Sequence, residues 1–179
     1  MPIDYTTEMI LALDILNANG YLWTRVKANN SAPLINEGDM ICLKKSGYAL
    51  KKGDLVALDY QKLFIVQRIV KLSGETIYTK ADHSEKGPFM QPIGIVAGKV
   101  VLIKKTQDLL NIDNRLCDRI HLLITRYSVG RSETYINTGF FYRKFFHKLR
   151  RSILKRLLKL EIIIGRKYAK NVDPGLQIP

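Results

Sequence analysis

The chain has 179 residues, of which 46% are apolar and 25% are charged, and its formal net charge is +13. This length suits one domain with an appendage, and the apolar content is enough for a hydrophobic core, which excludes disorder throughout the chain. The two cysteines, Cys42 and Cys117, and the three histidines have no metal-ligand spacing. We therefore expect reduced, buried thiols and neither a metal nor another cofactor.

The positive charge is concentrated near the C-terminus. Residues 141–170 carry 11 Lys/Arg and one acid, Glu161, whereas the rest of the chain carries 18 Lys/Arg and 15 acids. Because the rest is nearly neutral and holds no recognised nucleic-acid motif, the charge argues against a nucleic-acid partner. No run approaches the ~18 apolar residues of a membrane-spanning helix, and MPIDYTTEM lacks the features of a secretory signal. We expect a cytoplasmic protein. Any membrane attachment would be peripheral, at the membrane surface.

The first segment, residues 1–22, is predicted to contain an N-terminal helix and a lead-in strand. Residues 5–18 form a helix-length run that contains Met9, Leu11, Leu13, Ile15 and Leu16, and Asn19-Gly20 is a typical helix end. The following residues, YLWTRV, alternate between apolar and polar side chains. That period of two predicts a strand.

The second segment, residues 23–105, is predicted to be a small β domain. The runs MICLKK, LVALDY, LFIVQRIVKL, TIYTKAD and GIVAGKVVLIKK are rich in β-forming residues and are separated by turn signals. DHSEKGPFMQP is predicted to be a loop, and Gly98 indicates a bulge or a close approach of two backbones. Short strands at this spacing favour a mainly β fold, a small antiparallel barrel-like domain.

The last part of the chain is predicted to be helical. Residues 106–128 have the period of a packing helix, and residues 129–179 contain a connector, a basic amphipathic helix over 141–164 that Gly165 ends, and a tail. One side of the basic helix carries Phe146, Leu149, Ile153, Leu157, Leu160 and Ile164, and the opposite side carries Lys144, Lys148, Arg151, Lys155 and Lys159. Three interpretations stay open: docking on the β domain, attachment to an anionic membrane surface, or insertion into a partner's groove.

Three landmarks follow one another along the chain: VKANNSAPLINEGD, then GDLVALDY and FIVQRIV, then YTKAD and PIGIVAGKVV. In this order they resemble the serine-peptidase family of type I signal peptidases and LexA-like self-cleaving repressors, in particular its small, anchorless branch. Members of that family carry the box V-x-G-x-S-M-x-P-x-I-x-x-G-D, a second Gly-Asp, a strand with Lys or His-Arg, a Lys-Gly-Asp turn and a Gly-Lys-Val strand. The likeness covers roughly residues 8–125.

The two chemical positions of the family are altered in this chain. When the box is aligned without a gap on its proline and its Gly-Asp, Asn30 takes the place of the nucleophilic serine and Ser31 the next position. Gln67-Arg68 stands where His-Arg is usual. An amide is neither a nucleophile like serine nor a base near neutral pH. The resemblance therefore implies degenerate catalytic positions at Asn30, Ser31 and Gln67, which is typical of a pseudoenzyme.

The resemblance implies that the chain binds an extended peptide, or a partner protein of a peptide-processing system, without cleaving it. The residues expected to contact that peptide are Pro33, Phe64, Val66 and Arg68. Three aspartates, Asp39, Asp54 and Asp82, are expected to hold turns through side-chain-to-backbone hydrogen bonds.

Two alternatives belong to other functional classes. The first is an active serine endopeptidase in which Ser31 attacks the peptide; its base would be Lys27, Lys62, Lys80 or His83. The second is a peripheral membrane adaptor that attaches through the basic helix. The distance between the Ser31 hydroxyl and the nearest basic nitrogen, and the placement of the basic helix, separate these hypotheses.

Overall fold

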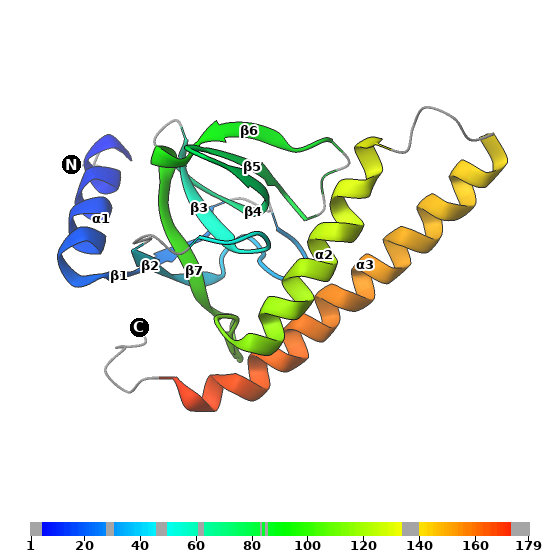
Figure 1. The fold of residues 1–179 in the computed structure, drawn as a ribbon. Helices are drawn as coiled ribbons and strands as arrows, with labels where there is room; N and C mark the ends of the chain where they lie inside the picture. Colours follow the sequence, from blue (N-terminus) through cyan, green and yellow to red (C-terminus); the bar gives the residue numbers. More distant parts are fainter. Residues whose placement is uncertain are drawn as a thin grey trace.

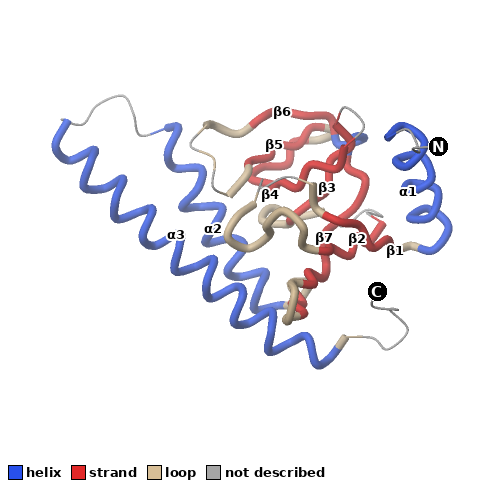
Figure 2. Tube along the Cα trace, turned by 180° about the vertical axis from the view of Figure 1, so that it is seen from behind, coloured by secondary structure: helices blue, strands red, loops and turns tan. Residues whose placement is uncertain are grey.

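The structure is a computed structural model that describes residues 5–27, 31–45, 50–60, 63–82, 84, 86–133 and 140–172. Its centre is one eight-stranded antiparallel sheet. Helix α1 (Tyr5–Asn19) lies at one end of the sheet, and helices α2 (Arg115–Glu133) and α3 (Phe140–Tyr168) run side by side at the other (Figure 1). The view from behind shows the same arrangement (Figure 2).

The strands are β1 (Tyr21–Arg25), β2 (Met40–Lys45), β3 (Leu55–Tyr60), β4 (Leu63–Ser73), β5 (Thr76–Lys80), β6 (Phe89–Pro92), β7 (Val96–Lys104) and β8 (Leu109–Asn111), with 3-10 turns η1 (Ile93–Ile95) and η2 (Ala169–Asn171). Their order in the sheet is β1-β2-β7-β3-β4-β5-β6, and β8 pairs with β7. Strands β1 and β6 end this order, so the sheet does not close. The predicted mainly β, antiparallel, barrel-like class is confirmed in this open form.

Glycines account for two sharp features of this fold. Gly20 has φ +77 and its N–H bonds to the Leu16 carbonyl, so the chain leaves α1 in the left-handed conformation that glycine favours. A Cβ on Gly98 would lie 2.9 Å from the Lys44 carbonyl oxygen of the neighbouring strand. The predicted close backbone approach at Gly98 is thus confirmed. It lets β7 lie close to its antiparallel neighbour β2.

Three predicted boundaries differ from the structure. The stretch predicted as a loop contains β6, and the predicted helix over 106–128 instead begins with β8, so that α2 starts only at Arg115. Asn114 explains that start, because its side-chain oxygen accepts hydrogen bonds from the N–H groups of Leu116 and Cys117 as a helix cap. Gly165 does not end the basic helix, which continues to Tyr168.

The main hydrophobic core is shared by the sheet and the C-terminal helices. Leu158 of α3 is buried with Leu34, Leu43, Leu55 and Leu110 in one cluster. Gly165 is buried where α3 crosses β8, and a Cβ there would lie 3.2 Å from the Cβ of Leu110. The basic helix is therefore docked on the domain.

Candidate functional site

Two strand edges flank the segment that resembles the peptidase box. Of the described strands, β2 is the one that pairs with β1. Strand β4 pairs with β3 over Leu63–Arg68, but its pairing with β5 begins only at Arg68. The first half of β4 therefore has an edge that no described strand occupies. Unpaired edges of this kind can accept an additional strand.

A depression of about 80 Å³ lies beside these edges. It is lined by Glu8, Met9 and Ala12 of α1, by Thr24, Arg25 and Lys27 of β1 and the residues after it, and by Leu63 and Phe64 of β4. This volume holds several water molecules or one small side chain. The lining combines apolar side chains with one acid and two bases, as is common in peptide-binding surfaces.

Ser31 is buried and does not line the depression. Its side chain is 1% exposed, and its Oγ donates a hydrogen bond to the Val66 carbonyl oxygen of β4 at 3.1 Å. The Ser31 carbonyl in turn accepts a hydrogen bond from the Ile35 N–H at 3.0 Å. The Ser31 hydroxyl thus holds its loop against β4, which is a structural role.

The bases considered for Ser31 have other partners where the structure describes them. Lys27 Nζ forms an exposed ion pair with Glu8 Oε2 at 3.2 Å. Lys80 is buried, and its Nζ donates to the Ser128 carbonyl oxygen at 2.9 Å. Lys62, His83 and Asn30 lie outside the described residues. No pairing of Ser31 with a basic nitrogen is therefore present in the part of the chain that the structure describes.

Gln67, at the predicted base position, and the residues predicted to contact the peptide lie in different environments. The Gln67 side-chain oxygen accepts a 2.6 Å hydrogen bond from the Thr79 hydroxyl. Pro33 is exposed, Phe64 is half-buried in the lining of the depression, and Val66 is buried in the core. Of these, Pro33 and Phe64 remain accessible, while the Val66 side chain is buried and its carbonyl is engaged by Ser31.

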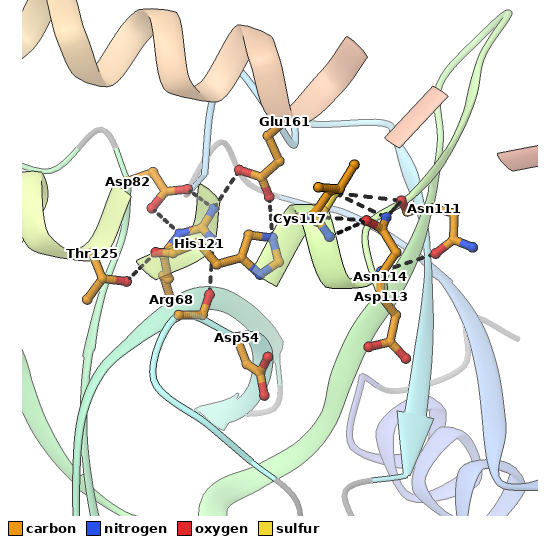
Figure 3. Close-up of polar contacts among 12 residues, drawn as sticks. Asp54, Arg68, Asp82, Asn111, Asp113, Asn114, Cys117, His121, Thr125 and Glu161 are labelled. Atoms are coloured by element: carbon orange, nitrogen blue, oxygen red, sulfur yellow. Dashed lines mark hydrogen bonds and ion pairs between the residues drawn. The ribbon is translucent and has the colours of Figure 1, made fainter. Parts of the chain in front are cut away.

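Arg68 was expected to contact the peptide, and this expectation is wrong. Its side chain is 0% exposed, because it lies under α3. The guanidinium donates to both carboxylate oxygens of Asp82 at 2.8 Å, to Glu161 at 3.2 Å and to the Gly53 carbonyl at 3.0 Å (Figure 3). Asp82, expected to hold a turn, is instead the bidentate partner of this buried arginine.

Glu161 and His121 complete the buried polar cluster. Glu161 is the single acid of the basic helix, and its Oε1 lies 2.6 Å from His121 Nε2. Burial alone would raise the pKa of Glu161, but the charge of Arg68 and the contact with His121 hold it below its usual value. Sequence patterns did not single out this cluster, although one acid within so basic a helix is a signal that could have found Glu161.

Two of the three predicted turn aspartates are confirmed. Asp39 Oδ2 accepts the Asn36 N–H at 2.9 Å, and Asp54 Oδ2 accepts the Lys51 N–H at 2.9 Å. Asp39 also pairs with Lys105 Nζ at 2.7 Å. Both aspartates close the Gly-Asp turns that precede β2 and β3.

The basic helix presents a mixed surface. Lys148, Arg151, Lys155 and Lys159 are exposed. The predicted apolar side is divided: Leu157 packs against the main core, Ile153 is half-buried, and Leu149 and Leu160 are exposed together with Ile163. The side chains of Lys144 and Phe146 lie outside the described residues. None of the described helices combines the length and the apolar character needed to cross a membrane.

Comparison of the chain with protein-family models gives no match, and comparison with curated proteins gives none.

Proposed function

We propose that this chain binds an extended peptide along the cleft between β1 and β4, as an added strand, and does not cleave it. The peptide would belong to a partner or substrate of a peptide-processing system, as the resemblance to signal peptidases implies. The observation that carries the proposal is the pair of strand edges beside the depression with which no described strand pairs.

The backbone of β4 is suitably oriented for such pairing. The Val66 carbonyl bonds to Ser31, so it points away from the β3 ladder. Hydrogen-bonded and non-bonded pairs alternate along an antiparallel ladder, so Phe64 has the same orientation as Val66. The Phe64 N–H and C=O are then available to an incoming strand. A small side chain of that peptide would enter the depression that Phe64 and Leu63 line.

Several observations support binding without cleavage. The Ser31 hydroxyl is buried and engaged with a carbonyl, and Gln67 is an amide held by Thr79. A nucleophile needs a neighbouring base that accepts its proton, and both described lysine candidates are engaged elsewhere. Loss of both partners of a nucleophile–base pair removes the mechanism.

Peptide binding can be measured by fluorescence anisotropy with a pool of fluorescein-labelled ten-residue peptides that carry alanine at alternate positions. Leu63→Glu places a charge in the depression near Glu8 and should weaken binding about tenfold, equivalent to about 1.4 kcal/mol. The matched control is Tyr60→Glu, because Tyr60 is the cross-strand neighbour of Leu63, is similarly exposed and does not line the depression. Equal affinity of the two variants would contradict the proposal.

Mass spectrometry of the same peptides after incubation tests the second half of the proposal. All peptides should remain intact, and a serine-reactive acylating probe should leave the protein unlabelled. Labelling that disappears in Ser31→Ala would establish the alternative, an active serine endopeptidase.

A second candidate function is attachment to an anionic membrane surface through α3. It is favoured by the exposure of Leu149, Leu160 and Ile163 on a helix whose other exposed side chains include Lys148, Arg151, Lys155 and Lys159. Exposed apolar and basic side chains on one helix suit an interfacial position, where each basic residue adds about 1 kcal/mol with anionic lipid.

Co-sedimentation of the full chain with phosphatidylserine-containing vesicles tests this second candidate. Replacement of Leu149, Leu160 and Ile163 by serine should abolish binding, whereas replacement of Ile10, Leu11 and Ile15, which are exposed on α1, should not. An unmodified chain that stays in the supernatant at low salt would exclude membrane attachment through α3.

A further inference from the structure

We propose that Asp54, Asp118 and His121 form a binding site for a divalent transition-metal cation, with Zn²⁺ as the best-fitting ion. One ligand atom from each of the three residues lies within 4.8 Å of the other two. Asp54 belongs to the turn before β3, and Asp118 and His121 are three positions apart on α2. The site is distinct from the peptide cleft, and it was not expected from the sequence.

One buried polar atom of each residue in this cluster lacks a hydrogen-bond partner. Among the described residues, buried side-chain atoms without a hydrogen bond are Asp54 Oδ1, Asp118 Oδ1, His121 Nδ1 and Trp23 Nε1. Three of these four atoms therefore belong to the three residues of the cluster. Burying a polar atom without a partner is unfavourable, so a ligand that satisfies all three at once would be strongly preferred there.

His121 is held in the orientation that a metal ligand needs. It is 2% exposed, and its Nε2 contacts Glu161 Oε1, which Arg68 holds in turn. Figure 3 shows the imidazole between Glu161 on one side and Asp54 on the other. When Nε2 carries the proton and donates it to Glu161, Nδ1 keeps a lone pair. A carboxylate behind the imidazole is the usual support of a metal-bound histidine.

Gly53 brings the turn close enough to α2 for the three residues to meet. It has φ +100, and a Cβ at this position would lie 2.8 Å from the Cβ of His121. Any other residue would be strained by this backbone conformation and would push the turn from the helix. The contact between the turn and α2 therefore depends on glycine immediately before Asp54.

The charge around the cluster also favours a divalent cation. Among the described residues, hydrogen bonds and ion pairs link the cluster into a network of five carboxylates and three basic groups: Asp54, Asp82, Asp113, Asp118 and Glu161, with Lys51, Arg68 and Lys99. With His121 neutral, the excess of two negative charges equals the charge that a divalent cation supplies.

The neighbouring lysines leave room for the ion. Lys51 Nζ contacts Asp118 Oδ2, and Oδ1 of that carboxylate stays without a hydrogen bond. Lys99 Nζ lies 3.2 Å from Asp54 Oδ1 as an ion pair but bonds more closely to Asp113, at 2.7 Å. Lys99 can therefore keep Asp113 when a cation takes Asp54.

The donor set indicates which ion fits. One imidazole nitrogen and two carboxylate oxygens are ligands of zinc, at about 2.0–2.2 Å, in tetrahedral sites where ligand atoms lie about 3.4 Å apart. Separations of up to 4.8 Å would therefore shorten by up to about 1.4 Å when the ion binds. Three protein ligands leave the fourth position to water, as in open rather than closed zinc sites. The bound ion would fasten the turn before β3 to α2.

The test uses the full-length chain, freed of metal with a chelator. Titration with ZnCl₂ in a calorimeter should give one site per chain with a Kd in the micromolar range or tighter, and CoCl₂ should produce a visible absorption band. Asp118→Asn should weaken zinc binding at least tenfold, and it is the variant of choice because Asp118 is only half-buried. The matched control is Asp108→Asn, which removes a carboxylate paired with Arg166 outside the cluster and should bind zinc normally.

The nitrogen chemical shifts of His121 give a readout that does not depend on affinity. Zinc should shift Nδ1 and leave Nε2 protonated. Absence of binding at 1 mM ZnCl₂, unchanged affinity in Asp118→Asn, or protons on both ring nitrogens in the presence of zinc would each overturn the proposal. Because peptide binding is measured separately, failure of one proposal leaves the other standing.

Discussion

Arg68 shows how a single residue joins distant parts of this chain. Its guanidinium donates to Asp82 after β5, to Glu161 of α3 and to the Gly53 carbonyl before β3. Burial alone would lower the pKa of Arg68, but the charges of Asp82 and Glu161 raise it, so the group stays charged. A buried charge is tolerated only where partners compensate it, and here two carboxylates and a carbonyl do so.

We predict that Arg68→Met destabilises the fold by about 3–5 kcal/mol, because Asp82 and Glu161 would remain buried without a cation. Urea unfolding measured by circular dichroism gives this value. Arg166→Met is the control, since its ion pair with Asp108 is exposed and should contribute less than about 1 kcal/mol. Similar stability losses in both variants would argue against an essential role for the buried pair.

Cys42 should be unreactive in the native chain. It is 0% exposed, and burial raises the pKa of its thiol from 9.0 to about 12. Because the raised pKa lowers the fraction of thiolate at pH 8, and the thiolate is the reactive form, iodoacetamide should leave Cys42 unmodified for hours. Mass spectrometry should find the label only after urea is added. Rapid labelling of the native chain would mean that this part of the sheet opens readily.

At the scale of elements, close approach rather than helix termination explains Gly165. Helix α3 continues past this residue to Tyr168, and the missing side chain lets the helix lie against Leu110 and Asn111 of β8. Gly98 plays the corresponding part between β7 and β2. Both glycines mark places where two elements touch through their backbones.

We predict that Gly165→Val costs about 1–3 kcal/mol, the range typical of overpacking. The new side chain would begin 3.2 Å from the Leu110 Cβ and 3.4 Å from the Asn111 carbonyl oxygen. Ser152→Val is the matched control, because Ser152 is exposed on the same helix. Thermal unfolding of both variants decides the matter: equal midpoints would show that α3 can move away from β8 without cost.

At the scale of the whole molecule, the basic C-terminal segment is part of the fold. It supplies Leu158 to the main core and Glu161 to the buried polar cluster. The exposed basic residues therefore belong to a helix that is packed into the core of the domain.

Truncation after residue 139 should consequently abolish cooperative thermal unfolding, because it exposes the core around Leu110 and leaves Arg68 without Glu161. Truncation after Val172 removes only the last seven residues and should leave the unfolding midpoint within a few degrees. Near-ultraviolet circular dichroism distinguishes the two outcomes. A cooperative transition in the shorter chain would show that the sheet folds without α3.

Local patterns predicted much of this architecture. Alternation of apolar and polar residues located β1, and runs of β-forming residues between turn signals located β2 to β5 and most of β7. A helix-length run that ends at Asn19-Gly20 located α1, and the amphipathic period located α3. The Gly-Asp pairs predicted the turns held by Asp39 and Asp54. Strands β6 and β8 were missed, because three or four residues carry too little periodicity and become strands through pairing with a neighbour.

Local patterns did not predict the buried polar clusters. Glu161 lies 93 residues from Arg68, and Asp54 is far along the chain from His121, so no spacing in the sequence links them. Folding removes these side chains from water and places them next to one another, and only then do they become partners. Periodicity reports which side of an element is buried; which distant charges meet on that side depends on how the elements are packed.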